Sequence, residues 1–351
     1  MGQLVPYPYL SYVLTAMGRT GFPIMLPAAV LLIAAACGKG PDQAPDRVSV
    51  SFEALPPAIS KSLSSEAEDR VETLDLLVFR ADDGLLDAHA RSSSSLRVGS
   101  AVTAGIRLRW YVIANAPAAA LDGYANEAEF LDGETFLGES ASLAMHASGQ
   151  GIFSAGENRS IQGILLHRYA CKVSVTELNV RWLGAFSQSP PCTLDEVALV
   201  NVRGSCPWSG TPTAEAGDLW YNPSRIDLQD ASIQELLVWE GPLIIPGPDP
   251  VPLHIPLYAL PNPSSGEETG GGGPWSPRKT RLCLRLTIDG IQNWYSADLP
   301  PMDGNRHYVV TRLVIDGPGS AHPDEELVRT QISYNLQVQD WEDSWNDLSF
   351  E

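Results

Sequence analysis

Residues 48–54 read VSVSFEA, a strict alternation of apolar and polar side chains. Successive side chains of a β-strand point to opposite faces, so this period of two predicts a strand with one buried face. The same pattern returns near the other end of the chain, where residues 332–339 read ISYNLQVQ. The predicted buried faces are Val48, Val50, Phe52 and Ala54 in the first strand, and Ile332, Tyr334, Leu336 and Val338 in the last.

The chain between these two strands carries further strand signals. Residues 71–79 (VETLDLLVF) predict a strand that runs into the turn Asp82-Asp83-Gly84, with a return strand beginning at Leu85. Residues 106–112 predict another strand, with apolar side chains at alternate positions. The remaining predicted strands lie around residues 161–183, 194–202, 280–289, 306–315 and 329–340.

Helical signals are few and short. Residues 118–129 predict a short helix, and residues 232–239 predict a helical turn. The stretch 241–263 is rich in proline, which has no N–H to donate and is therefore kept out of central strands. The pattern as a whole predicts an all-β chain.

Composition excludes several classes of protein. Asp and Glu number 42 against 23 Lys and Arg, which gives a formal net charge of −19. Binding to nucleic acid or to anionic lipid through phosphates needs an excess of positive charge, so neither partner is expected. Hydrophobic residues make up 44% of the chain, which excludes wholesale disorder. Gly (30) and Pro (28) fit a turn-rich β-protein.

The N-terminus has the pattern of an export signal. Residues 22–36 read FPIMLPAAVLLIAAA, too short to span a bilayer comfortably and typical of a signal-peptide core. The small residues before Cys37 resemble the lipobox of bacterial lipoproteins. This resemblance implies cleavage between Ala36 and Cys37 and lipidation of the Cys37 thiol. An ordinary secretory signal is the alternative. Residues 1–16 fit no part of a signal, so translation is expected to start at Met17.

Length predicts two domains. Removal of residues 1–36 leaves 315 residues, more than the roughly 250–300 that a single core usually supports. We therefore expect a leading tether, first strand and β-sandwich in residues 37–165, and a second β-sandwich in residues 166–351.

The other four cysteines form no zinc-like pattern. Cys171 and Cys283 lie inside predicted strands and are expected to be buried thiols that pack as small apolar groups. Cys192 and Cys206 flank one segment and have two alternatives, a disulfide in an oxidising compartment or free thiols.

Motifs for catalysis are missing from the sequence. The six histidines show no metal-ligand spacing, and neither an HExxH nor a GxSxG motif occurs. Gly270–Gly273 lacks the context of a phosphate-binding loop. We therefore expect no enzyme, no metal and no cofactor.

Tryptophan is abundant, with nine residues, and suggests an alternative function. Trp110 and Trp239 fall in apolar patterns and are predicted to belong to the core. Trp220, Trp275 and Trp294 are the candidates for an exposed platform that stacks on sugar rings. A lipid-anchored glycan-binding protein is therefore the alternative to a structural role.

The two terminal strands suggest that structural role. Residues 61–66 (KSLSSE) form a polar linker after the first strand; if this linker were cut, the strand could leave and open a groove. The last strand could fill such a groove on a neighbouring molecule, with backbone hydrogen bonds and pockets for alternate side chains. The alternative is that both strands complete their own sheets.

Several segments together resemble the fimbrillin superfamily, lipoprotein-derived pilus subunits of anaerobic Gram-negative bacteria. The segments that carry the resemblance are VETLDLLVF, RLRWYVIANAP, HRYACKVSV, PLYALPN, DGNRHYVVTRLVIDGPGSAHPD and ISYNLQVQDWEDSW. The resemblance implies two tandem transthyretin-like (Ig-like Greek-key) β-sandwich domains and assembly outside the outer membrane.

The resemblance also implies a processing step. In shaft and tip subunits of the family, a trypsin-like protease cuts after a basic residue before the VETLDLLVF-type strand, and a C-terminal strand of another subunit is thought to fill the vacated groove. The residue at the matching distance here is Lys61, where arginine is usual; Arg70 is the second candidate but lies close to the strand.

The sequence thus predicts a pilus or fimbria subunit (shaft, tip or anchor) at the outer membrane or cell surface. Its expected partners are other subunits through strand exchange, membrane lipid through Cys37, and a host glycan or protein ligand.

Overall fold

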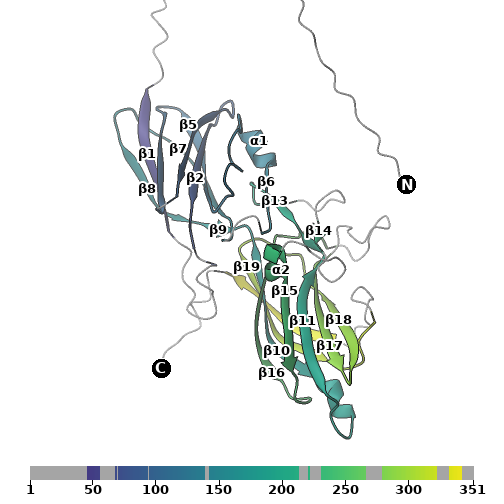
Figure 1. Cartoon of the computed structure of the whole chain (residues 1–351). Coiled ribbons are helices and arrows are strands. Elements are labelled where there is room, and N and C mark those ends of the chain that lie inside the picture. The colour runs from purple at the N-terminus through teal and green to yellow at the C-terminus, as the bar shows by residue number, and fades with distance from the viewer. Residues whose placement is uncertain are drawn as a thin grey trace, which may run out of the picture. The chain divides into compact units, whose positions relative to one another are not determined.

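The computed structural model describes residues 46–55, 68, 70–93, 95–138, 142–212, 220–221, 231–265, 279–321 and 332–341. These residues belong to one compact unit, Pro45–Glu351. Almost all of the regular structure is β, as the alternating patterns predict (Figure 1). No helix among these residues is both long enough and apolar enough to cross a membrane.

The first half of the unit forms two sheets, here called the N-terminal sandwich. The first sheet has the order β4-β1-β8, and the second has the order β3-β2-β5-β7-β9. Their strands are β1 (Arg47–Leu55), β2 (Leu74–Arg80), β3 (Leu86–Ser92), β4 (Arg97–Thr103), β5 (Arg107–Ala114), β7 (Met145–Ile152), β8 (Arg159–Leu165) and β9 (His167–Arg168). One buried cluster contains side chains of both sheets, so the sheets pack face to face.

Strand β2 shows why a nearly continuous apolar run forms here. Its first six residues are all buried, because alternate side chains face two different cores. Leu74, Leu76 and Val78 face the interior of the N-terminal sandwich. Leu77 and Phe79 face the other way, and the Phe79 ring stacks on Phe130 of helix α1 (Glu127–Asp132) with centroids 5.6 Å apart. A strand covered on both faces needs no polar face.

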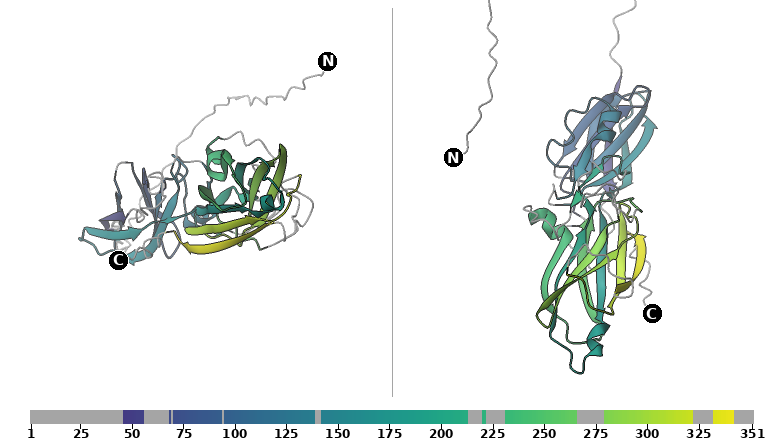
Figure 2. Two further views of the ribbon diagram at one scale, coloured as in Figure 1. Left: turned by 90° about the horizontal axis from the view of Figure 1, so that it is seen from below. Right: turned by 90° about the vertical axis from the view of Figure 1, so that its right-hand side faces the viewer.

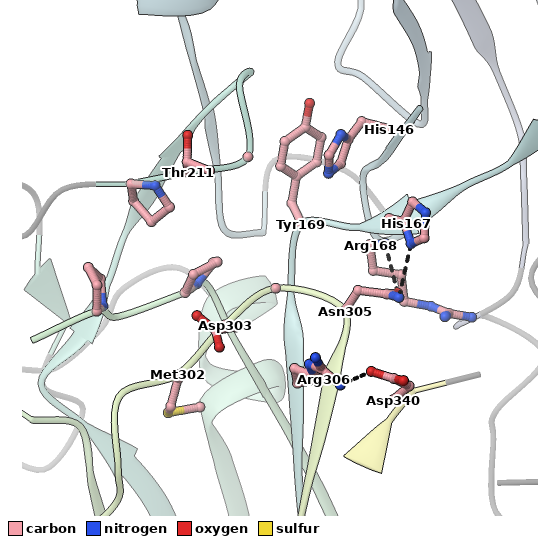
Figure 3. Close-up of a pocket in the computed structure, with 15 residues that line it drawn as sticks. His146, His167, Arg168, Tyr169, Thr211, Met302, Asp303, Asn305, Arg306 and Asp340 are labelled. Atoms are coloured by element: carbon pink, nitrogen blue, oxygen red, sulfur yellow. Dashed lines mark hydrogen bonds and ion pairs between the residues drawn. The ribbon is translucent and has the colours of Figure 1, made fainter. Parts of the chain in front are cut away.

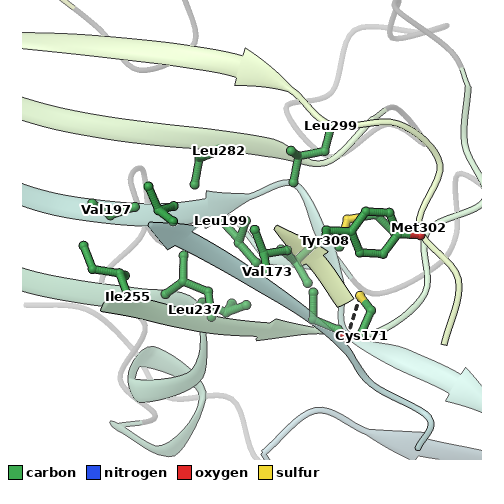
Figure 4. Close-up of a cluster of buried hydrophobic side chains, with 14 of the residues drawn as sticks. Cys171, Val173, Val197, Leu199, Leu237, Ile255, Leu282, Leu299, Met302 and Tyr308 are labelled. Atoms are coloured by element: carbon green, nitrogen blue, oxygen red, sulfur yellow. Dashed lines mark hydrogen bonds between the residues drawn. The ribbon is translucent and has the colours of Figure 1, made fainter. Parts of the chain in front are cut away.

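The second half forms two four-stranded sheets, here called the C-terminal sandwich, with orders β16-β10-β19-β20 and β15-β11-β17-β18. Figure 4 shows side chains from both sheets meeting in one core, among them Val173, Val197 and Leu282. The strands are β10 (Cys171–Val180), β11 (Cys192–Val200), β15 (Val238–Ile244), β16 (Val251–Ala259), β17 (Arg281–Ile288), β18 (Ile291–Asp298), β19 (Arg306–Ile315) and β20 (Ile332–Asp340).

Two parallel pairings connect strands that are distant in the sequence. Strand β1 runs parallel to β8, and β10 runs parallel to β19. Gly163 has φ +74° in β8, beside the point where the register with β1 shifts between Phe52 and Ala54. Glycine adopts this backbone conformation without strain, which permits the bulge.

Short elements complete the described part of the unit. They are β6 (Glu134–Phe136) paired with β13 (Ser205–Pro207), β12 (Val202–Arg203) paired with β14 (Trp220–Tyr221), the 3-10 turn at Arg181–Ala185, and α2 (Ala231–Leu237). Helix α2 agrees with the helical turn predicted at 232–239.

The helix predicted at residues 118–129 is wrong in its position. Most of that stretch forms turns, with Ala119 and Gly123 at positive φ, and α1 begins only at Glu127. Asn126 determines this start, because its side chain accepts a hydrogen bond from the Glu129 N–H and so caps the helix.

Two edge strands of the C-terminal sandwich contain proline. The stretch 241–263 does form strands, β15 and β16, and each is the outermost strand of its sheet. The expectation that proline keeps this stretch out of central positions is confirmed. Strands β4, β7 and β18 are additional to those that the sequence patterns predicted.

Candidate functional site

The first strand lies in the middle of its sheet. Strand β1 pairs with β4 on one side and β8 on the other, so its departure would separate these two neighbours (Figure 1). Its apolar face is almost completely buried, with exposed fractions of 4% for Val48, 1% for Val50, 1% for Phe52 and 2% for Ala54. Burying a side chain the size of Val or Phe is worth about 1.5–3 kcal/mol, so this strand contributes strongly to the sandwich.

The apolar side chains that β1 covers would form a groove if β1 left, and we call this the first-strand groove. The Phe52 ring lies 5.1 Å from the Trp110 ring of the opposite sheet. Most of the other buried members of the same cluster come from β2, β4, β5, β7 and β8. They include Leu74, Leu76, Val78, Val98, Val102, Leu108, Val112 and Ile164. Removal of β1 would leave these side chains without cover and two sheet strands without a partner.

The last strand lies at the edge of its sheet. Among the described strands β20 pairs with β19 alone, in antiparallel register, and Figure 2 shows it at the margin of the C-terminal sandwich. Ile332 is 9% exposed, Tyr334 and Leu336 are half-buried against the core, and Val338 is 51% exposed. The Tyr334 hydroxyl donates a hydrogen bond to the Asp298 carbonyl. The strand is thus held within its own chain, but less completely than β1.

The residues proposed for lipidation and for cutting differ in what the structure says of them. Cys37 and Lys61 lie outside the described residues. Arg70 is described: its side chain pairs with Glu72 at 3.3 Å, and its carbonyl accepts a hydrogen bond from the buried Asn115 side chain at 2.8 Å.

A pocket of about 620 Å³ opens beside β9 and β19 (Figure 3). On one side the His146 ring stacks on Tyr169, with centroids 4.5 Å apart. Burial and the neighbouring His167 lower the pKa of His146 to about 4, so its imidazole is neutral at physiological pH. On the other side Arg306 forms an ion pair with Asp340, the last residue of β20.

This pocket presents charged, hydrogen-bonding and apolar groups side by side. Asn305 bridges two elements: its side chain accepts from the Arg168 N–H and lies 3.2 Å from His167 Nδ1. Among the described residues no group of three or more His, Cys, Asp or Glu is arranged to hold a metal ion.

All four described cysteines are buried free thiols. This matches the expectation for Cys171 and Cys283, and it corrects the alternative of a disulfide between Cys192 and Cys206. Cys206 lies in the short strand β13, whereas Cys192 begins β11, so the two thiols sit in separate ladders. Burial raises the pKa of Cys192 to about 11 and that of Cys206 to about 12.

The tryptophans give no support to a sugar platform. Trp110 and Trp239 pack partly buried against the two cores, close to the predicted role. The Trp294 ring is half-buried under the Arg285 guanidinium, at 5.6 Å. For Trp220 the structure describes only the backbone, which lies in β14, and Trp275 lies outside the described residues.

Sequence reasoning missed a buried group of side chains around Glu68, Lys172 and Trp341. In the run CKVSV, Lys172 and Ser174 alternate with Cys171, Val173 and Val175, so the pattern placed Lys172 on a polar face and gave no signal of its burial. A buried lysine needs an acid as its partner. Nothing local in the sequence identified that acid as Glu68, which lies 104 residues away.

Comparisons with known proteins agree with the β-sandwich architecture. No family model and no curated protein matches the chain. Among solved structures, a candidate cell adhesion protein of Bacteroides eggerthii matches with a TM-score of 0.57 and 14% identity, over 86% of this chain and 98% of that protein.

Two fimbrial proteins of Porphyromonas gingivalis also match. A fimbrilin matches with a TM-score of 0.56 and 16% identity, over 84% of this chain and 98% of its own. The tip fimbrial protein Mfa3, with a C-terminal truncation, matches with a TM-score of 0.51 and 15% identity, over 84% of this chain and 100% of its own. None of these neighbours is described as an enzyme. The chain therefore has the fold of the fimbrillins and related cell adhesion proteins of Bacteroidales.

Proposed function

We propose that the chain is a structural subunit of a cell-surface fimbria that assembles by strand exchange and supports adhesion. The observation that carries the proposal is the match between the two terminal strands. Strands β1 and β20 each have nine residues and four alternate apolar side chains; all four are buried in β1, and three of the four pack on a core in β20, where Val338 is exposed. A strand of this length and pattern from one molecule is suited to replace β1 in another.

The positions of the two strands favour exchange in one direction. Strand β1 is central and buried, so a groove left by its loss has a strong drive to be refilled. Strand β20 has one neighbouring strand among the described residues and a half-exposed apolar face, so its release loses fewer contacts than the release of β1. The groove therefore acts as acceptor and β20 acts as donor.

The remaining parts of the proposal come from the sequence. Cys37 carries the lipid that takes the chain to the outer membrane, and a cut after Lys61 removes the lipid and β1 together. Residues 37–165 and 166–351 act as the two domains, the first with the acceptor groove and the second with the donor strand. A subunit that escapes the cut keeps its lipid and serves as an anchor.

The test is the N-terminal sequence and intact mass of the protein taken from assembled fimbriae and from the outer membrane. We expect an unlipidated N-terminus at Ser62 in the fimbrial fraction, because polymerisation needs an open groove. Assembled subunits that all retain residues 37–61 would overturn strand exchange at the first-strand groove.

A further inference from the structure

A buried ion pair joins the connection after β1 to the C-terminal sandwich. Glu68 lies in the connection between β1 and β2, and both of its carboxylate oxygens lie 3.0 Å from Lys172 Nζ of β10. The Tyr258 hydroxyl of β16 donates to the same carboxylate. Glu68 is 3% exposed and Lys172 is 4% exposed, so water does not screen this pair.

The same group of side chains holds the residue that follows β20. Trp341 is 5% exposed, and its ring lies 4.5 Å from the Arg168 guanidinium and 5.9 Å from Lys172 Nζ. The Tyr258 ring stacks on it with centroids 6.0 Å apart. Its backbone N–H donates to the Asn305 carbonyl at 3.2 Å. The end of β20 therefore packs on the two cations that surround Glu68.

The charges make these contacts depend on one another. Arg168 is 1% exposed and donates to the Glu68 carbonyl at 3.4 Å, so a second buried cation contacts the same residue. His307 adds no charge, because burial and Lys172 lower its pKa to about 4. If Glu68 left, Lys172 would keep its charge in a poorly solvated space without this carboxylate and would move toward water. Trp341 would then lose the surface on which it packs.

We propose that Glu68, Lys172, Tyr258, Arg168 and Trp341 form a latch that couples the connection after β1 to the C-terminal strand. While Glu68 is held, β20 stays paired with β19; release of Glu68 frees β20. The proposal deepens the proposed strand exchange and rests on it for its biological meaning, because it makes processing of the first strand prepare the donor strand.

Covalent connectivity explains how a cut would act on the latch. In the intact chain the connection 56–67 is fixed at both ends, at Leu55 in β1 and at Glu68 in the latch. A cut after Lys61 leaves Glu68 as the seventh residue of a new N-terminus. Chain ends fray more readily than closed connections, so Glu68 would leave the latch more often. One cut would thus open the acceptor groove and loosen the donor strand.

Hydrogen exchange followed by mass spectrometry tests the latch in the full-length monomer in detergent. We expect Glu68→Gln to speed exchange of the peptide that spans β20 by about tenfold or more, with β18 unchanged. The matched control is Asp316→Asn, which removes a carboxylate from the half-exposed pair with Arg181 and should leave β20 unchanged. The double variant Glu68→Gln, Lys172→Met removes both charges and should restore most of the protection of β20.

Three results would overturn the latch. The first is unchanged exchange of β20 in Glu68→Gln, and the second is an equal rise in exchange in β18, which would mean general destabilisation. The third is a failure of the double variant to restore protection, because the unpaired buried cation would then not be the cause.

The effect of the cut can be measured on the same peptide. A lysine-specific protease has four targets in this chain, Lys39, Lys61, Lys172 and Lys279, of which Lys172 is buried. We expect faster exchange of β20 in the monomeric fraction of the treated chain and no change in treated Lys61→Gln. Equal exchange in both would refute the coupling. These readouts use monomers, so a failed latch leaves strand exchange standing, and failed polymerisation leaves the latch standing.

Discussion

Burial changes the acid–base behaviour of side chains that look ordinary in the sequence. His146 stacks on Tyr169 beside the pocket, and His307 lies 2.8 Å from the Ser174 hydroxyl in the second sandwich. Burial lowers the pKa of each to about 4, from an ordinary value of 6.5. Both imidazoles are therefore neutral in the folded chain at a pH where they would be charged in the unfolded chain.

This difference predicts a loss of stability in mild acid. A histidine with a lowered folded-state pKa contributes its full stability above pH 6.5 and loses it as pH falls toward about 4, because only the unfolded state takes up the proton. The loss should reach on the order of 3 kcal/mol for each histidine. Urea unfolding between pH 7 and pH 4.5 measures it. The double variant His146→Asn, His307→Gln should show a shallower slope; an equal slope would contradict the explanation.

The four buried thiols should be inert in the folded chain. Burial raises the pKa of Cys206 and Cys283 to about 12 and that of Cys192 to about 11, and it also raises the pKa of Cys171. The thiolate is the reactive form, so alkylation at pH 8 should be negligible without denaturant. Iodoacetamide labelling with mass spectrometry should find all four modified in guanidinium without reductant. A requirement for reductant would reveal a disulfide that the structure does not contain.

Phe52 is the residue of β1 that should matter most to stability. Its ring is 1% exposed and packs on Trp110, so Phe52→Ala should cost about 3–5 kcal/mol, from the lost contact and the cavity left behind. Ser49→Ala, on the exposed face of the same strand, is the matched control and should change little. Denaturant unfolding measures both. Equal effects would show that the apolar face of β1 does not hold the sandwich.

At the scale of elements, edge position distinguishes the donor strand from the acceptor. Strand β20 has a free edge and an apolar face that thins out toward Val338, whereas β1 is enclosed on all sides. Prolines keep β15 and β16 at the edges as well, which protects those edges from pairing with other chains. Strand β20 contains no proline, so its edge is open to exchange.

Leu336→Asp tests this role of β20. The side chain is half-buried at the edge of the core, so the change should cost the monomer only about 1–3 kcal/mol and leave it folded. In an acceptor groove the same position would be enclosed, and a carboxylate there should abolish polymer formation. Gln337→Asp, on the exposed face, is the control. Electron microscopy and size-exclusion chromatography measure the amount of polymer. A normal amount of polymer from Leu336→Asp would show that β20 is not the donor strand.

At the scale of the whole molecule, processing should act as a single switch. Treatment of the full-length chain with the lysine-specific protease should remove the segment before Ser62 and allow polymers to form, because the first-strand groove then needs a new strand. Lys61→Gln should keep β1 and stay monomeric under the same treatment, although Lys39 and Lys279 remain as targets. Gel filtration and N-terminal sequencing follow both. Polymer formation by the uncut variant would separate assembly from processing at this residue.

Much of the fold followed from local patterns. Alternation located β1, β5 and β20, and proline predicted which strands lie at edges, because both signals depend on the strand itself. Strand β18 was not predicted, although the dipeptide Asp289-Gly290 is a typical signal of a two-residue hairpin turn. In the structure these two residues have φ +52° and +77° and form the turn between β17 and β18.

The sequence by itself determined the all-β class, most of the strands and their apolar faces, since these depend on side-chain period and turn chemistry. Only the tertiary structure decided the parallel pairing of β1 with β8 and of β10 with β19, the free state of Cys192 and Cys206, and the union of Glu68 with Lys172 and Trp341. Each of these features depends on the relative positions of residues that are far apart in the chain or belong to different sheets. Local periodicity carries no information on such partners, because the packing of the whole unit selects them.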